Sequence, residues 1–250
     1  NLRNIRAGKL LKALALVVAN LWAGWRTDAF IFGEEDKAKP FRILYHRKKH
    51  IYLPYYPDLG YIHPMPTNDI AKECRVLYAG ALTKEKGWER VMSTMNNIAQ
   101  LLPKTQFQLD IVTKDHFAYS KEYDNLHICK LDFMPFEQFC KQIVQYDIFL
   151  DLRDIDFENT RCLPIKLFYY MACGRPSIYS NLTAIRKGVA QIDDCAFLVD
   201  DIEQATQAML QYISNPTLYK RHSQRALELS QQQYNWQSIK IRLTQLIDEL

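Results

Sequence analysis

The sequence is poor in glycine, has no paired cysteine motif and contains no long hydrophobic run. Eight glycines and 10 prolines in 250 residues are too few for a collagen-like or low-complexity chain. With 48% apolar and 24% charged residues, the composition is that of a globular protein rather than a disordered one. At roughly 150 residues per domain, the length predicts one or two domains.

Cysteine usage argues against a disulfide framework and against a zinc site. No two cysteines form a C-x-x-C pair, and no histidine lies at ligand spacing beside one. We therefore expect no bound metal, and reduced thiols that pack as small apolar side chains, as in a cytoplasmic protein. The cysteines are Cys74, Cys129, Cys140, Cys162, Cys173 and Cys195.

The first 25 residues look like a signal peptide, because basic residues precede an uncharged run. That run covers residues 13–25, which is too short to span a bilayer. Its apolar side chains recur at helical spacing, which predicts an amphipathic helix instead. The stripe consists of Leu14, Val17, Val18, Leu21, Trp22 and Trp25.

The positive charge is concentrated at one end of the chain. Residues 1–50 hold 11 Lys/Arg against 4 Asp/Glu, whereas the other 200 hold 21 against 24. Such a basic segment suits an anionic membrane surface, although a solvated charged face is an equal alternative. Nucleic acid is not expected, because the sequence has no helix-turn-helix, zinc-finger or aromatic ribonucleoprotein motif. The densest cluster is Arg42, Arg47, Lys48 and Lys49.

A proline-rich stretch separates two differently patterned parts of the sequence. Before it, residues 27–32 predict a buried strand, and residues 42–45 and 49–53 predict extended segments. Five prolines and glycines fall between Pro54 and Pro66. Because this density breaks helix and sheet, we place a domain junction near residues 54–70.

After the junction, predicted strands and helices alternate along the chain. This alternation is typical of an α/β fold, a Rossmann-like parallel sheet with helices on both faces. Asn215 and Pro216 predict the cap and first turn of a later helix. Strands are predicted at residues 75–79, 106–112, 125–129, 147–152 and 176–180, and helices at 87–102, 135–146, 164–173, 201–213, 216–232 and 236–250.

Two strand ends carry residues suited to an anionic ligand, and ligands of parallel sheets bind at the carboxyl ends of the strands. Gly80 follows the first strand, and Lys86 lies beside the next helix N-terminus, although a plain turn with a solvated lysine would look the same. Pro164 suits a first helical turn, so Arg161 would lie next to free N–H groups. We expect anion binding there.

The motif Pro164-x-Lys166-Leu-Phe-x-Tyr-Met-Ala-x-Gly174-x-Pro, preceded by Leu-Tyr-Ala-Gly80 and Lys86-Gly, resembles the donor-binding domain of group 1 glycosyltransferases (glycosyltransferase family 4). Agreement covers most of residues 73–250, and residues 27–35 and 52–54 resemble the last strands of the acceptor-side domain. The resemblance implies a GT-B fold. Residues 1–62 would be the end of a truncated N-terminal domain, 63–235 the donor-binding domain, and 236–250 a helix crossing back.

This resemblance implies a glycosyltransferase that moves a sugar from a UDP- or GDP-sugar to a glycan or lipid-linked acceptor. Transfer would retain the anomeric configuration and need neither metal nor cofactor, since the nucleotide sugar is a substrate. The implied role is surface polysaccharide or glycolipid synthesis in the cytoplasm, peripherally at the inner membrane face. A non-catalytic sugar-nucleotide-binding protein and a GT-B nucleotide-sugar epimerase are the alternatives.

The resemblance also implies the site residues, with two departures from the family pattern. The family's arginine after the glycine is Ala81 here, and its two glutamates eight apart fall on Arg161 and Tyr169. Tyrosine can donate one hydrogen bond but cannot accept two, and arginine is better suited to phosphate. Arg161 would then replace the charge missing at Ala81. Lys86 and Arg161 are the implied catalytic residues, and Gly80, Thr160, Cys162, Leu163, Lys166, Tyr169 and Met134 the implied donor-binding residues.

The corner formed by Phe133, Met134 and Pro135 resembles the place where the family holds the nucleotide base, with core packing as the alternative. A GT-B enzyme needs a whole acceptor domain, which takes well over a hundred residues. We therefore expect this sequence to be part of a larger enzyme and unable to complete transfer with these residues alone.

Overall fold

The computed structural model describes residues 7–67, 69–119 and 123–249. The chain divides into two compact units. The larger unit comprises Tyr55–Ser238, and the smaller comprises Asn1–Pro54 together with Ile239–Leu250. The larger unit holds the candidate site.

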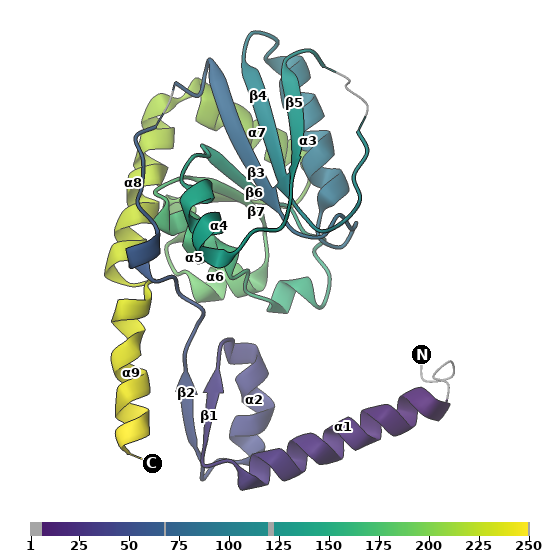
Figure 1. Cartoon of the computed structure of the whole chain (residues 1–250), viewed down its shortest axis with the longest axis vertical. Coiled ribbons are helices and arrows are strands. Elements are labelled where there is room, and N and C mark those ends of the chain that lie inside the picture. Colours follow the sequence, from purple (N-terminus) through teal and green to yellow (C-terminus); the bar gives the residue numbers. More distant parts are fainter. Residues whose placement is uncertain (1–6, 68, 120–122, 250) are drawn as a thin grey trace. The chain divides into compact units, whose positions relative to one another are not determined.

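A six-stranded, fully parallel sheet forms the centre of the larger unit (Figure 1). Its strand order, β5-β4-β3-β6-β7-β8, runs outward in both directions from the pair β3 and β6. A ligand cleft is expected at the carboxyl ends of the two strands where the order reverses. The strands are β3 (Glu73–Ala79), β4 (Gln106–Val112), β5 (Leu126–Leu131), β6 (Ile148–Asp151), β7 (Ser177–Ser180) and β8 (Ala196–Val199).

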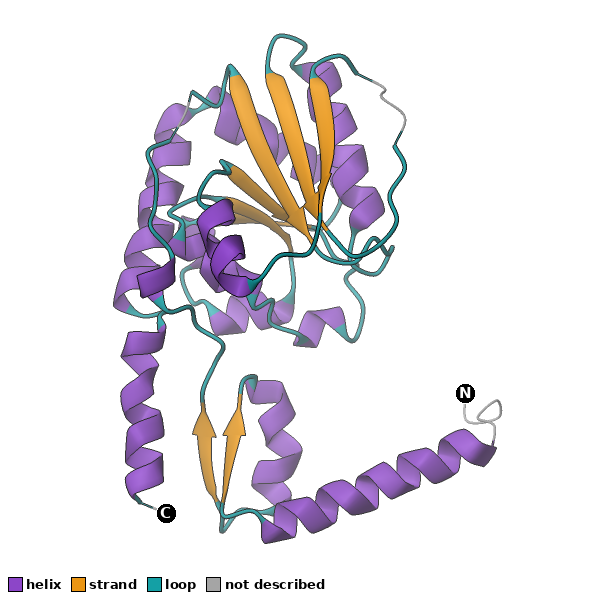
Figure 2. Cartoon of the chain, viewed as in Figure 1, coloured by secondary structure: helices purple, strands orange, loops and turns teal. Residues whose placement is uncertain are grey.

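Helices cover both faces of this sheet (Figure 2), which confirms the fold class predicted from the alternating pattern. One buried apolar cluster joins the sheet to α4, α5 and α6, and a second joins it to α3 and α7. Burial on both faces explains why all four residues of β6 are buried. The helices of this unit are α3 (Trp88–Leu101), α4 (Phe136–Ile143), α5 (Lys166–Ala172), α6 (Thr183–Gly188), α7 (Ile202–Ser214) and α8 (Pro216–Gln232).

Most predicted elements of the larger unit are confirmed. β4 and α8 have the predicted bounds, and the Asn215 carboxamide caps α8 by accepting a hydrogen bond from the Leu218 N–H at 3.0 Å. α5 begins two residues later than predicted, at Lys166. Two short elements, α6 and β8, were not predicted.

The smaller unit contains a two-stranded parallel sheet, in which β1 (Ala29–Phe32) pairs with β2 (Lys49–Tyr52). Between them lies α2 (Glu35–Leu44), so the predicted extended segment at residues 42–45 is wrong. Ala38, Phe41 and Tyr45 are spaced for one helix face, and the Phe41 ring lies 5.6 Å from the Phe30 and Phe32 rings. This packing against β1 outweighs the local strand preference of residues 43–45.

α1 (Ala7–Arg26) confirms the predicted helix, but its apolar stripe is uncovered. The side chains of the stripe are between 44% and 68% exposed, from Leu21 to Trp25. Arg3 and Arg6, which belong to the basic segment, lie outside the described residues. Within the described ranges, no helix combines the length and apolar character needed to cross a membrane.

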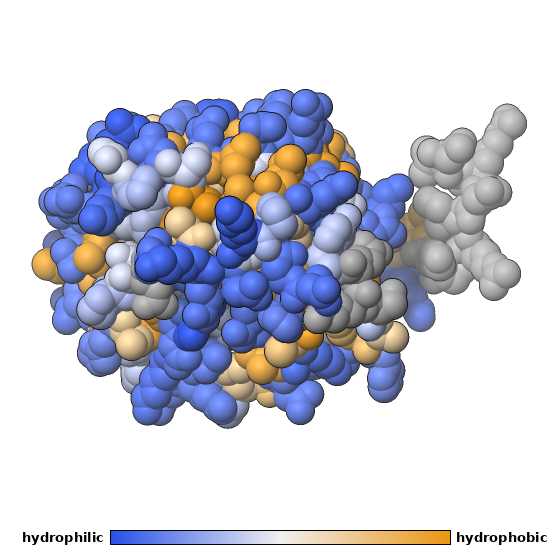
Figure 3. Space-filling model, turned by 90° about the horizontal axis from the view of Figure 1, so that it is seen from above, coloured by the Kyte–Doolittle hydropathy of each residue, from blue (hydrophilic) through white to orange (hydrophobic). Residues whose placement is uncertain are grey.

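α9 (Trp236–Asp248) begins in the larger unit, and its residues from Ile239 onward belong to the smaller one. Within the smaller unit, the Lys49 ammonium donates to the Glu249 carboxylate at 3.0 Å. Seen from above, the surface is mostly hydrophilic, and its largest apolar area lies in the upper half of the view (Figure 3).

Candidate functional site

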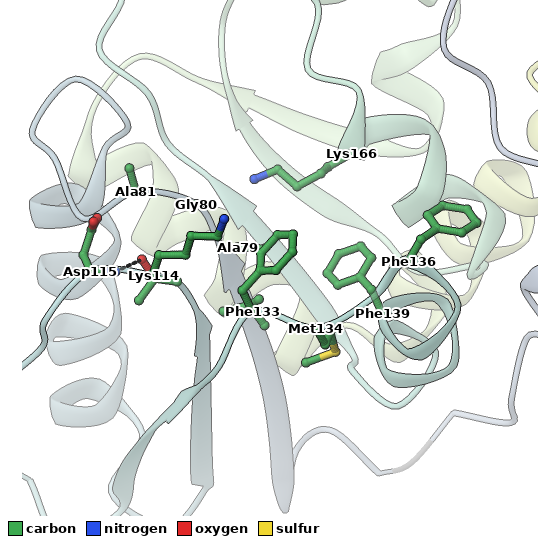
Figure 4. Close-up of a pocket in the computed structure, with 12 residues that line it drawn as sticks. Ala79, Gly80, Ala81, Lys114, Asp115, Phe133, Met134, Phe136, Phe139 and Lys166 are labelled. Atoms are coloured by element: carbon green, nitrogen blue, oxygen red, sulfur yellow. Dashed lines mark hydrogen bonds between the residues drawn. The ribbon is translucent and has the colours of Figure 1, made fainter.

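A cavity of about 600 Å³ opens at the carboxyl ends of β3, β4 and β5 (Figure 4). α4 and α5 complete its walls, so it lies beside the reversal of strand order, where a parallel sheet is expected to bind ligands. Its lining consists of Ala79, Gly80 and Ala81 from the end of β3, Val112, Thr113, Lys114 and Asp115 from the end of β4, Phe133 and Met134 after β5, Phe136 and Phe139 from α4, and Lys166 from α5.

One wall of the cavity is aromatic and apolar. Phe133 and Met134 follow β5, and Phe136 and Phe139 come from the helix that begins directly afterwards. The Phe133 side chain is 66% exposed, so its ring is accessible to a ligand. A flat, apolar ligand such as a nucleotide base would stack well on this wall.

The opposite wall is polar and fixed in place by hydrogen bonds. The Asp115 carboxylate accepts from the Leu82 N–H, and the Asp115 N–H donates to the Thr113 hydroxyl at 3.2 Å. The Lys114 side chain extends from the end of β4 toward Phe133 (Figure 4). Its ammonium lies 4.4 Å from the centre of the Phe133 ring. This contact is a cation–π interaction, which a stacking ligand would replace.

Lys166, the first residue of α5, extends into the cavity toward the end of β3 (Figure 4). Its ammonium would lie only 3.7 Å from a Cβ atom placed on Gly80. Burial lowers the pKa of Lys166, Asp151 partly opposes this effect, and the positive charges of Arg153 and Lys86 add to it. Lys166 is therefore a partly desolvated cation whose charged form is disfavoured.

A buried ion pair lies at the carboxyl end of β6. The Arg153 guanidinium donates two hydrogen bonds to the Asp151 carboxylate, at 2.7 and 2.9 Å. Burial alone would lower the pKa of Arg153, but the Asp151 charge outweighs it and raises the pKa. Because the two charges neutralise each other, Asp151 is only partly available to balance Lys166.

The loop between β3 and α3 is held rigidly against the end of β6. Gly87 has a φ of 78°, and a Cβ atom there would lie 1.9 Å from the Leu152 carbonyl oxygen. The Tyr78 hydroxyl donates to the Ala81 carbonyl at 2.6 Å, and the Asp154 N–H to the Glu85 carbonyl at 3.2 Å. Glycine is needed at position 87 because this backbone approach leaves no space for a side chain.

Neither of the two residues expected to be catalytic lines the cavity. Lys86 forms a 2.7 Å ion pair with Glu85, and it is close enough to Lys166 to lower the pKa of that lysine. The Arg161 guanidinium lies 3.7 Å from the centre of the exposed Phe157 ring, and Arg161 does not line the cavity.

The other expected donor-binding residues fall into two groups. Gly80, Met134 and Lys166 line the cavity together, whereas Thr160, Cys162, Leu163 and Tyr169 do not. The Thr160 hydroxyl donates to the Asp156 carbonyl at 2.6 Å, and the Leu163 side chain is buried. The Tyr169 ring packs against Phe136 at 5.8 Å, so it supports the aromatic wall from behind, and burial raises its pKa.

Sequence reasoning missed several cavity residues. Thr113, Lys114 and Asp115 directly follow the strand predicted at 106–112. They were predictable, because ligands of parallel sheets bind at the carboxyl ends of the strands. Phe136 and Phe139 had no such signal, because a helix with apolar residues is usually read as core. Across the part of the chain that the structure describes, no group of three or more His, Cys, Asp or Glu side chains could hold a metal ion.

The strand order and the cavity beside its reversal define the larger unit as a Rossmann-like ligand-binding domain. Residues 73–215 match the family model described as glycosyl transferases group 1. The chain therefore belongs to the group 1 glycosyltransferase family. No curated protein sequence matches the chain.

Solved structures show the same fold. Sucrose-phosphate synthase from Thermosynechococcus elongatus is 18% identical with a TM-score of 0.62, and the match covers 89% of this chain and 58% of that one. The C-terminal domain of a group 1 glycosyltransferase from Francisella tularensis is 14% identical with a TM-score of 0.55, covering 72% and 98%. The HepE protein of Anabaena, solved with UDP-glucose, is 12% identical with a TM-score of 0.63, covering 90% and 64%.

These matches establish the fold and confirm the expected GT-B relationship. The chain spans 58% of the synthase and 64% of the Anabaena protein. It corresponds to only part of such proteins.

Proposed function

We propose that the protein transfers a sugar from a nucleoside diphosphate sugar to a glycan or lipid-linked acceptor. The observation that supports this most is the cavity itself, which brings together an aromatic wall and two lysines at the carboxyl ends of a parallel sheet. A nucleotide has the matching chemistry, since its base is flat and its diphosphate is anionic. Family membership and the UDP-glucose complex of the Anabaena protein point in the same direction.

In the proposed complex, the base stacks on Phe133 and Met134, and the diphosphate lies toward the end of β3. The glycosidic bond between the anomeric carbon and the phosphate oxygen breaks, and its electron pair stays on that oxygen. The acceptor hydroxyl oxygen bonds to the anomeric carbon, and its proton is taken up by the released nucleoside diphosphate. Cations near the diphosphate favour this step because negative charge grows there in the transition state.

Several finer features belong to the same proposal. Lys86 is a proposed phosphate ligand, because it lies in the rigid loop beside the cavity and its charge acts on Lys166. Arg161 could serve the donor only after leaving the Phe157 ring. Lysines in place of a metal ion would make transfer metal-independent, and retention of the anomeric configuration is carried over from the family.

Calorimetry with a matched pair of phenylalanine variants tests the donor site. Phe133 and Phe157 are similarly exposed, at 66% and 69%, but only Phe133 lines the cavity. Base stacking is worth about 1–3 kcal/mol, so Phe133→Ala should weaken the binding of UDP or GDP about tenfold or more. Phe157→Ala should leave it within twofold. Equal effects of both variants, or no binding of either nucleotide to the parent, would refute the site.

Turnover decides between an enzyme and a non-catalytic binder. The complete enzyme that contains this chain, supplied with UDP- or GDP-sugars and membrane extract containing acceptors, should release nucleoside diphosphate in a donor-dependent reaction. Tight nucleotide binding without any release would favour the binder. Conversion of the donor sugar to its epimer without an acceptor would favour the epimerase.

We also propose that the smaller unit docks peripherally on an anionic membrane. The uncovered stripe of α1 and the nearby basic cluster support this, because apolar and cationic side chains together favour the membrane interface. Arg47→Glu should weaken the binding free energy to phosphatidylglycerol vesicles, measured by cosedimentation, by about 1–2 kcal/mol. Binding to phosphatidylcholine vesicles should not change. Equal, salt-insensitive binding to both vesicle types would contradict the electrostatic part.

A further inference from the structure

Most cations around the carboxyl ends of β3 and β6 already have a partner. A cation with a partner loses that interaction when it turns to a ligand, so it is less available for an anion. The pairs are Lys86 with Glu85 at 2.7 Å, Arg153 with Asp151 at 2.7 Å, Arg161 over the Phe157 ring at 3.7 Å and Lys114 over the Phe133 ring at 4.4 Å.

Lys166 differs from these cations. Throughout the described ranges, no carboxylate lies within ion-pair distance of its ammonium, and the nearby Asp151 is already bound by Arg153. The Lys166 side chain is partly buried and points into the cavity (Figure 4). A partly desolvated ammonium without an anion is unfavourable, and an anionic ligand would remove that penalty.

The place of Lys166 in the fold also fits a diphosphate. Its ammonium lies beside the backbone of Gly80 at the end of β3, where neither Gly80 nor Ala81 supplies a charged side chain. The aromatic wall lies on the other side of the same cavity. A nucleotide with its base on that wall would carry its phosphates toward Lys166.

We propose that Lys166 is the main cation that binds and neutralises the diphosphate of the donor, ahead of Lys86. This assignment rests on the proposed function. It gives Lys166 a role that the family resemblance assigned to Lys86 and Arg161. When the bond to the anomeric carbon breaks and its electron pair passes to the phosphate oxygen, the Lys166 ammonium stabilises the added charge, while Lys114 is released from Phe133 by the stacked base.

The test uses Lys166→Met, which keeps the length and burial of the side chain but removes its charge. Lys84→Met is the matched control, because Lys84 is an exposed lysine in the neighbouring loop and does not line the cavity. The probes are UDP, uridine and inorganic pyrophosphate, measured by calorimetry on the protein. A charge-assisted bond predicts that Lys166→Met binds UDP and pyrophosphate about ten- to a hundredfold more weakly.

Uridine separates a ligand-binding role from a structural one. It carries the base without phosphates, so its affinity should be the same in the parent and in Lys166→Met. The inference is overturned if Lys166→Met binds UDP as tightly as the parent does. It is also overturned if Lys166→Met weakens the binding of uridine as much as that of UDP, or if Arg161→Met loses more UDP affinity than Lys166→Met. It is also overturned if the parent does not bind pyrophosphate.

The same measurements distinguish a failure of the proposed function from a failure of the Lys166 assignment. A parent that binds pyrophosphate through Lys166 but binds neither UDP nor GDP would retain the anion site and refute the nucleotide donor. Lys166→Met should unfold at the same or a higher urea concentration than the parent, because it loses an unpaired, partly buried charge. Lys166→Arg should recover part of the UDP affinity.

Discussion

Gly87→Ala should be among the most destabilising single substitutions in the larger unit. An alanine Cβ atom would lie 1.9 Å from the Leu152 carbonyl oxygen, well inside contact distance. The Leu152 carbonyl belongs to the backbone and the Cβ atom is bonded directly to the backbone at position 87, so neither can turn away as the end of a flexible side chain would. The positive φ of 78° adds strain of about 1 kcal/mol for any residue other than glycine.

Gly174→Ala provides the matched comparison, because it tests the same backbone conformation without the clash. Gly174 has a φ of 64°, and an added Cβ would lie 3.4 Å from the Leu227 side chain, an ordinary contact. Gly174→Ala should therefore cost about 1–2 kcal/mol of unfolding free energy. Gly87→Ala should cost more than about 4 kcal/mol, a range reached only by severe steric or burial defects.

Urea denaturation followed by circular dichroism measures both variants. If Gly87→Ala and Gly174→Ala lower the unfolding free energy equally, the close approach of the β3–α3 loop to the end of β6 is not real. If Gly87→Ala folds, we expect weakened UDP binding, because the loop that carries Gly80 and Lys86 must shift.

Three further predictions concern charge. Ala81→Arg in the Lys166→Met background should restore part of the UDP affinity, because position 81 lines the same cavity, and no recovery would contradict the placement of the phosphates. The pKa of Lys166 is lowered, so its charge is lost as pH rises and UDP affinity measured by calorimetry should fall at a lower pH than for an ordinary lysine. Burial lowers the pKa of His222 to about 4, below its unfolded value, so its contribution to stability is complete above about pH 6.5 and lost as pH falls to 4. That loss should reach about 3 kcal/mol in urea titrations and be absent from His222→Phe.

The alternating strands and helices were predictable because burial on both faces of a parallel sheet leaves continuous apolar runs. β4 and α8 had clear limits in the sequence, set by an apolar run and by the Asn215-Pro216 cap. β8 was missed because a four-residue edge strand has little pattern of its own. The C-terminal part of α2 was predicted as an extended segment because its helical conformation depends on packing against the aromatic rings of β1, which is a tertiary contact.

Part of the candidate site was predictable, because ligands of parallel sheets bind at the carboxyl ends of the strands. Gly80, Met134 and Lys166 were expected and do line the cavity. The sequence could not show that Arg161 lies on Phe157, because side-chain stacking on an exposed loop is a tertiary contact. Nor could it show that no carboxylate of the described residues pairs with Lys166, since this depends on Asp151 being bound by Arg153.

A crystal structure of the protein bound to UDP or GDP, whichever binds more tightly, would test the donor site most directly. We expect the base on Phe133 and Met134, and diphosphate oxygens within hydrogen-bond distance of the Lys166 ammonium. A nucleotide bound elsewhere on the protein, with this cavity empty, would contradict both the proposed donor site and the role of Lys166.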